Sequence, residues 1–160
     1  QQMKIATRLA ILLALAAPVL DSHARGMEKD DLCPELKAFL ASVEPDETRT
    51  VVLRTYWGAK QVGDSIVLGS KGCEHNDYEP GKKLCAYLME HSSTEFSGHN
   101  AKRIINCLTP KPVIGRDLDI HSGSFSITFG SSDRGALVDL DVSPDEEPGE
   151  MVLRLQADGY

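Results

Sequence analysis

The stretch CEHNDYEPGKKLCAYLMEHSSTEFSGHNAKRIINC (residues 73–107) decides the fold of this chain. It holds three of the four cysteines, and sequence typical of β-strands lies on both sides of it. Residues 82–90 and a segment from about 92 to 108 have apolar side chains at helical spacing, which predicts a helical hairpin that turns near His91. The stretch predicts how the chain is held together, and it contains no catalytic motif.

The N-terminal residues predict export. Lys4 and Arg8 precede an apolar run over residues 9–20, and small residues before a cut after Ala24 complete the pattern of a secretory signal peptide. The run is too short to span a bilayer about 30 Å thick as a helix, so we expect no stable membrane insertion. The expected division is a signal peptide over residues 1–24 and a single α+β domain over residues 25–160, located in the periplasm or secreted.

The charge of the chain favours a basic partner. The sequence carries 17 Lys and Arg against 24 Asp and Glu, a net charge of −7. Removal of residues 1–24 takes away Lys4, Arg8 and Asp21, which leaves 15 basic residues (17 − 2) and 23 acidic residues (24 − 1), a net charge of −8. Nucleic acid is disfavoured as a partner, because phosphate binding needs a basic face. A protein with a basic surface would be attracted.

An even number of cysteines in an exported chain predicts disulfides. Zinc is the alternative, but the spacings contain no C-x-x-C pair and match no common zinc pattern. In a helical hairpin that turns near residue 91, Cys85 and Cys107 would differ in height by roughly 12 Å, whereas a bridge needs Cα atoms within about 7 Å. A bridge between Cys85 and Cys107 is therefore disfavoured, which leaves two pairings. Because Cys73 is expected in a loop that can reach further along the hairpin, we favour Cys33–Cys85 with Cys73–Cys107, and the pairing of Cys33 with Cys107 and Cys73 with Cys85 remains open.

Periodicity predicts the elements on either side. Residues 32–43 have apolar side chains at helical spacing, with Pro34 in the first turn, where its missing N–H costs nothing. A hairpin follows, and then a long polar loop over residues 69–81. The expected hairpin strands are 50–57 and 65–68.

The last third of the chain alternates between apolar and polar side chains, which predicts an antiparallel meander with one polar face. The expected fold is therefore α+β: a single small domain with an antiparallel sheet, built from an N-terminal hairpin and a C-terminal three-strand meander, together with an N-terminal helix and a disulfide-tied helical hairpin. The expected meander strands are 124–129, 136–142 and 151–155.

Few residues suggest a catalytic or metal-binding site. No nucleophile motif and no phosphate-binding loop occurs, the histidines have no metal-ligand spacing, and we expect no catalytic residue, no metal and no cofactor. Asp139, Asp141 and the acidic residues after them do not match an EF-hand. A histidine–carboxylate site around His75 and Asp77 is the enzymatic alternative.

Size, export and charge are similar to those of the inhibitor or immunity proteins that bacteria keep against cationic cell-wall hydrolases, although no family motif is matched. We expect an acidic loop, over residues 74–79 or 145–150, to enter a basic cleft, with an aromatic residue as a possible anchor. The alternatives are a small envelope enzyme and a structural component of an envelope assembly. The candidate binding residues are Tyr56, Trp57, Glu74, His75, Asp77, Asp145, Glu146 and Glu147.

Overall fold

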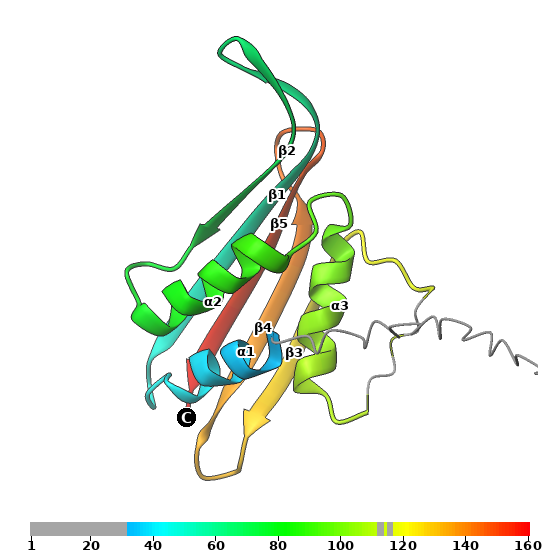
Figure 1. Ribbon diagram of the computed structural model, residues 1–160. Coiled ribbons are helices and arrows are strands. Elements are labelled where there is room, and N and C mark those ends of the chain that lie inside the picture. Colours follow the sequence, from blue (N-terminus) through cyan, green and yellow to red (C-terminus); the bar gives the residue numbers. More distant parts are fainter. Residues whose placement is uncertain (1–31, 112–113, 115–116) are drawn as a thin grey trace, which may run out of the picture.

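Three helices and five strands follow one another in the residues that the computed structural model describes, namely 32–111, 114 and 117–160 (Figure 1). The predicted signal peptide and residues 25–31 lie outside the described residues. The elements are α1 (Leu32–Ala41), β1 (Thr48–Val62), β2 (Ser65–Glu74), α2 (Glu79–His91), α3 (Ser97–Leu108), β3 (Gly123–Gly130), β4 (Gly135–Pro144) and β5 (Glu150–Gly159).

The strands form one antiparallel sheet in the order β2-β1-β5-β4-β3. The predicted hairpin is β1–β2, the predicted meander is β3–β4–β5, and the last strand pairs with the first, so that Leu53 lies opposite both Cys73 and Leu153. The predicted α+β fold is therefore confirmed. No described helix has the length and apolar character needed to cross a membrane.

All three helices cover the same face of the sheet (Figure 1). Strand residues alternate between faces, and the apolar ones that face the helices form the core with the inner stripes of the helices. The opposite face carries polar pairs, such as Ser126 with Asp139 and Ser124 with Asp141. The most buried core side chains include Leu32, Leu36, Phe39, Leu40, Val51, Leu53, Leu84, Leu88, Ile104, Leu140 and Leu155.

Two disulfides tie helices to the sheet and to each other. Cys33 of α1 is bonded to Cys107 of α3, with Cα atoms 5.1 Å apart, and Cys73 of β2 is bonded to Cys85 of α2, with Cα atoms 5.6 Å apart. The favoured pairing of Cys33 with Cys85 and Cys73 with Cys107 was wrong. The reason is that residues 69–74 are strand rather than loop: they pair with β1 and hold Cys73 next to α2.

The hairpin is longer than predicted and extends well beyond the helices (Figure 1). β1 pairs with β5 only as far as Tyr56, opposite Glu150, and beyond this point β2 is the one strand among the described residues that pairs with it. We call residues 57–69 the arm, because Trp57 and Gly69 are paired at its root. The rest of the hairpin, residues 48–56 and 70–74, is its base.

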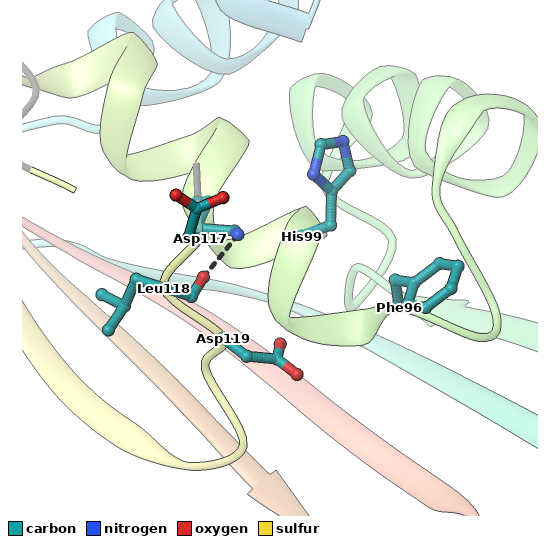
Figure 2. Close-up of a pocket in the computed structure, with 6 residues that line it drawn as sticks. Phe96, His99, Asp117, Leu118 and Asp119 are labelled. Carbon is teal, nitrogen blue, oxygen red and sulfur yellow. Dashed lines mark hydrogen bonds between the residues drawn. The ribbon is translucent and has the colours of Figure 1, made fainter. Parts of the chain in front are cut away.

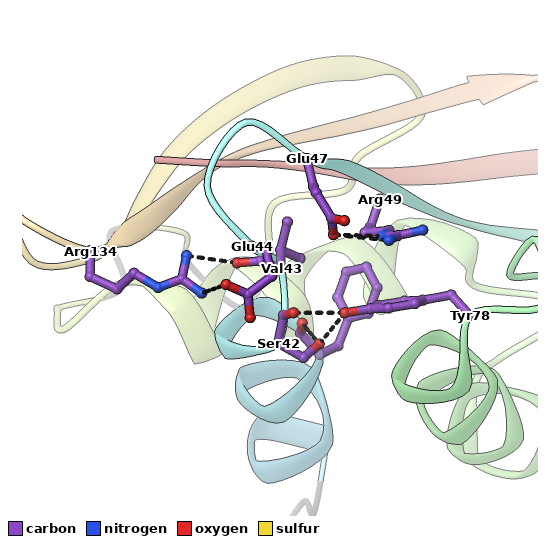
Figure 3. A network of polar contacts seen from close by, with 8 residues as sticks. Ser42, Val43, Glu44, Glu47, Arg49, Tyr78 and Arg134 are labelled. Carbon is purple, nitrogen blue, oxygen red and sulfur yellow. Dashed lines mark hydrogen bonds and ion pairs between the residues drawn. The ribbon is translucent and has the colours of Figure 1, made fainter.

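At the other end of the molecule a polar network fastens the chain after α1 (Figure 3). The Tyr78 hydroxyl lies 2.8 Å from both the carbonyl and the hydroxyl oxygen of Ser42. The Arg49 guanidinium lies over the Tyr78 ring, and Arg134 donates to the carbonyl of Val43. The connection between β2 and α2, which contains Tyr78, is thus packed against the body.

Candidate functional site

An apolar groove with an acidic rim lies at the root of the arm. It consists of two adjoining hollows of about 360 Å³ and 240 Å³ that share Phe96 and Asp119. Figure 2 shows the larger hollow, which is lined by Phe96 directly before α3, by His99 in the first turn of α3 and by residues 117–119. We call this the Phe96 groove. Its apolar lining residues are Trp57, Phe96, Leu118, Ile120 and Met151, and its acidic ones are Glu95, Asp117 and Asp119.

The turn between α2 and α3 places Phe96 on the surface. Asn100 is 2 % exposed, and its side chain accepts from the N–H of Ser93 at 2.9 Å and donates to the carbonyl of the same residue at 2.8 Å. The Ser93 hydroxyl in turn accepts from the N–H of Phe96. These bonds hold residues 92–96 in a turn, so that α3 begins at Ser97, later than predicted, and Phe96 is 61 % exposed.

Gly98 allows the far wall of the groove to lie directly on α3. A Cβ atom at this position would be 2.2 Å from the carbonyl oxygen of Ile120, which is too close for any side chain. Further along the helix, Lys102 donates from Nζ to the carbonyl of Leu118 at 2.5 Å (Figure 2). The absence of a side chain at 98 and the reach of Lys102 together fix the segment of residues 117–120 against the helix.

Trp57 forms the arm side of the groove. Its N–H donates to the carbonyl of Gly149 in the β4–β5 loop, and the pairing of β1 with β2 is interrupted between Trp57 and Lys60 by a bulge. Gly149 has φ +87°, and a Cβ atom there would lie 2.6 Å from the Trp57 carbonyl. The close approach leaves the indole 48 % exposed at the edge of the groove. Bulges often redirect a strand in this way next to functional surfaces.

The groove has a negative rim. Glu95, Asp117 and Asp119 line it together with Lys102, and Asp119 lies 3.5 Å from His121. A positive side chain that entered the groove would therefore meet carboxylates next to exposed aromatic surface. Exposed aromatic residues of this kind are frequent anchors of protein interfaces.

The two predicted acidic loops meet at Arg54. This arginine is bonded to Glu74, at 3.1 Å, and to Asp145. The hydrogen bond to Glu74 and the charge of Asp145 raise the pKa of Arg54 above its ordinary value. Glu147 is similarly occupied by Lys60, at 2.6 Å. Several of the predicted binding carboxylates thus already have a partner within the chain.

The remaining predicted residues lie apart from the groove. Asp77 and Glu146 are exposed, and Tyr56 is half-buried under Lys60, whose Nζ lies 5.5 Å from the ring centroid. His75 is half-buried, with a buried Nδ1 that has no partner in the described residues. No group of three or more His, Cys, Asp and Glu side chains in the part of the chain that the structure describes is placed to hold a metal ion.

Sequence reasoning found Trp57 but missed Phe96, Leu118 and Asp119. Phe96 fitted the expected inner stripe of a helix that was predicted to begin near residue 92. The serine and threonine residues at 92–94 were a signal for the turn, since these side chains bond to the backbone in turns rather than in helices. Leu118 and Asp119 lie in an irregular segment, for which periodicity gives no signal.

Comparisons of the chain with protein-family models, with curated proteins and with solved structures found no match. The function has to be inferred from the groove, the arm and the charge of the chain.

Proposed function

We infer that this protein is an exported binding protein that holds a basic protein partner in the Phe96 groove. The observation that carries this inference is the exposure of Trp57 and Phe96 at 48 % and 61 % beside a rim of carboxylates. Contiguous exposed apolar patches with a polar rim are typical of protein-binding sites. Two disulfides fit an oxidising compartment such as the periplasm or the extracellular space.

The partner class follows from charge. The chain has a net charge of −7, and the rim adds local negative potential, which speeds association with a basic surface and makes it sensitive to salt. A cationic cell-envelope hydrolase fits this description. Binding would inhibit such an enzyme by covering its cleft, with the aromatic pair as the apolar anchor and the carboxylates meeting basic residues around it.

The enzymatic alternative has weaker support. The histidine nearest to a carboxylate in the groove is His121, and both its side chain and that of Asp119 are largely exposed, at 87 % and 68 %. A general acid or base is normally held in place by packing and by further hydrogen bonds. We therefore propose binding rather than catalysis.

The test is a pull-down from an envelope extract with the oxidised protein, its F96S variant and an L137S variant. Leu137 is the matched control, because it is an exposed apolar residue on the opposite face of the sheet. We expect a basic protein to be captured at about 0.05 M salt and much less at about 0.5 M, since screening weakens attraction between exposed charges. F96S should lose this protein and L137S should keep it. Capture that F96S leaves unchanged would contradict the assignment to the groove.

A further inference from the structure

No described strand pairs with the outer edge of the arm. β2 is the outermost strand on one side of the sheet, and Ile66 and Leu68 are exposed at 72 % and 63 % on the same face of it. Unpaired strand edges of this kind are templates for pairing with another strand, and soluble proteins usually protect them with charge, proline or a covering element. Figure 1 shows no helix over this part of the hairpin.

The charge of the arm differs from that of the chain. Residues 57–69 contain one basic and one acidic residue, Lys60 and Asp64, so that the arm is neutral in a chain of net charge −7. Lys60 is already paired with Glu147. A strongly charged partner would therefore gain no electrostatic attraction at this edge. The backbone groups and apolar side chains would instead match an extended, uncharged, apolar strand.

The chain itself supplies such a strand. If two copies of β2 run antiparallel about a twofold axis at Val67, Ile66 of each copy lies opposite Leu68 of the other, on one face. In the same register Asp64 lies opposite Ser70, and no like charges are opposed. Cross-strand apolar pairs of this kind stabilise a sheet, and the arrangement is closed, because the same edge is used by both copies.

The length of the arm reduces repulsion between the two acidic bodies. Cys73, whose disulfide to Cys85 joins β2 to the body, lies six positions along the strand from Val67. At about 3.3 Å per residue this is about 20 Å, more than twice the Debye length of about 8 Å at physiological salt.

We propose that two copies of this protein associate through the outer edges of their β2 strands, with Ile66 beside Leu68 of the second copy, to form one continuous ten-stranded sheet. No residue of β2 is among the residues that line the Phe96 groove. The proposal is thus independent of what the groove binds.

The test is sedimentation velocity on the oxidised protein over a range of concentrations. We expect the wild type to change from monomer to dimer as its concentration rises. I66K/L68K should be monomeric, because it gathers four positive charges at the axis. I66K/L68E should still dimerise, because each introduced lysine then lies opposite an introduced glutamate of the other copy.

V62K is the control for a charge placed elsewhere in the arm, and it should dimerise like the wild type. F96S should also dimerise, whereas its failure to do so would show that the arm of one copy sits in the groove of another and would overturn the proposal. A wild type that is monomeric at every concentration, a dimer that survives I66K/L68K, or the loss of the dimer in I66K/L68E would overturn it equally. Circular dichroism and a thiol count would confirm that each variant is folded.

Discussion

The base and the arm of the β1–β2 hairpin have similar sequences and opposite surroundings. In the base, Val51, Val52 and Leu53 are buried, whereas in the arm Val62, Ile66 and Leu68 are among the most exposed apolar side chains of the described residues. Both parts are rich in β-forming residues and pair across the same two strands.

The base and the arm differ in the strands and helices that pack against them. The base pairs with β5 on its other side and is tied to α2 through Cys73 and Cys85, while in the part of the chain that the structure describes the arm has neither a third strand nor a helix. A two-stranded ribbon without cover is marginally stable in water. The comparison teaches that the same type of strand holds the fold together where it is covered and is available for binding where it is not.

The largest expected effect on stability comes from removing a disulfide from the body of the molecule. In the chain-entropy model, C33S/C107S, which opens a loop of 74 residues, should lower the free energy of unfolding by about 4.5 kcal/mol, and C73S/C85S, with a separation of 12, by about 3 kcal/mol. Urea denaturation of both variants measures the two values. A reversed order would show that the Cys73–Cys85 bridge is needed to keep the hairpin base on α2, beyond its effect on the unfolded chain.

A smaller effect is expected at the floor of the groove. G98A should cost about 1–3 kcal/mol, because the added methyl group must push the backbone of residue 120 away from α3. G72A is the matched control, since a Cβ atom at Gly72 would meet nothing within 4 Å. Thermal unfolding gives both values, and equal effects would contradict the close contact between α3 and Ile120.

A gain in stability of about 1 kcal/mol is expected from T55V in the base. Thr55 is 2 % exposed, and its hydroxyl has no hydrogen-bond partner within the described residues, so that the isosteric change removes a buried polar group without opening a cavity. Chemical denaturation measures the change. A loss of stability would mean that this hydroxyl is bonded, for example to a buried water molecule.

The smallest effect is expected in the arm. The hydrogen bond and the charge of Glu147 raise the pKa of Lys60 above its ordinary value of 10.5. A raised pKa contributes stability that is complete below 10.5 and is lost as the pH rises through the folded value. K60M should therefore differ from the wild type by the same small amount at pH 7 and at pH 9, as measured by urea denaturation, because exposed ion pairs contribute little. A difference that shrinks between these pH values would contradict the assignment.

The sequence was sufficient for the fold class, because helical and strand periodicities are set by the buried face of each element. It was not sufficient for the length of the hairpin. Gly69 and Gly72, which led to the prediction of a loop over residues 69–81, lie in β2, where pairing with β1 overrides their low β-propensity. That error also led to the wrong disulfide pairing.

The candidate site was predicted only where it coincides with a strand. Trp57 is in β1, and the sequence already placed it in an expected strand and among the candidate binding residues. The other side of the groove depends on the tertiary contacts of Asn100 and Gly98. Asn100 contacts Ser93, and Gly98 lies against Ile120. Helical and strand periodicity does not predict either contact.

A matched pair of substitutions in the two parts of the hairpin tests this division of roles. At a concentration where the protein is monomeric, L53A in the base should lower the free energy of unfolding by about 2–5 kcal/mol, and L68A in the arm should change it by less than about 0.5 kcal/mol. Urea denaturation of the two variants under identical conditions is the measurement. Similar losses in both would contradict the account, because they would show that the arm is held by packing rather than left open for binding.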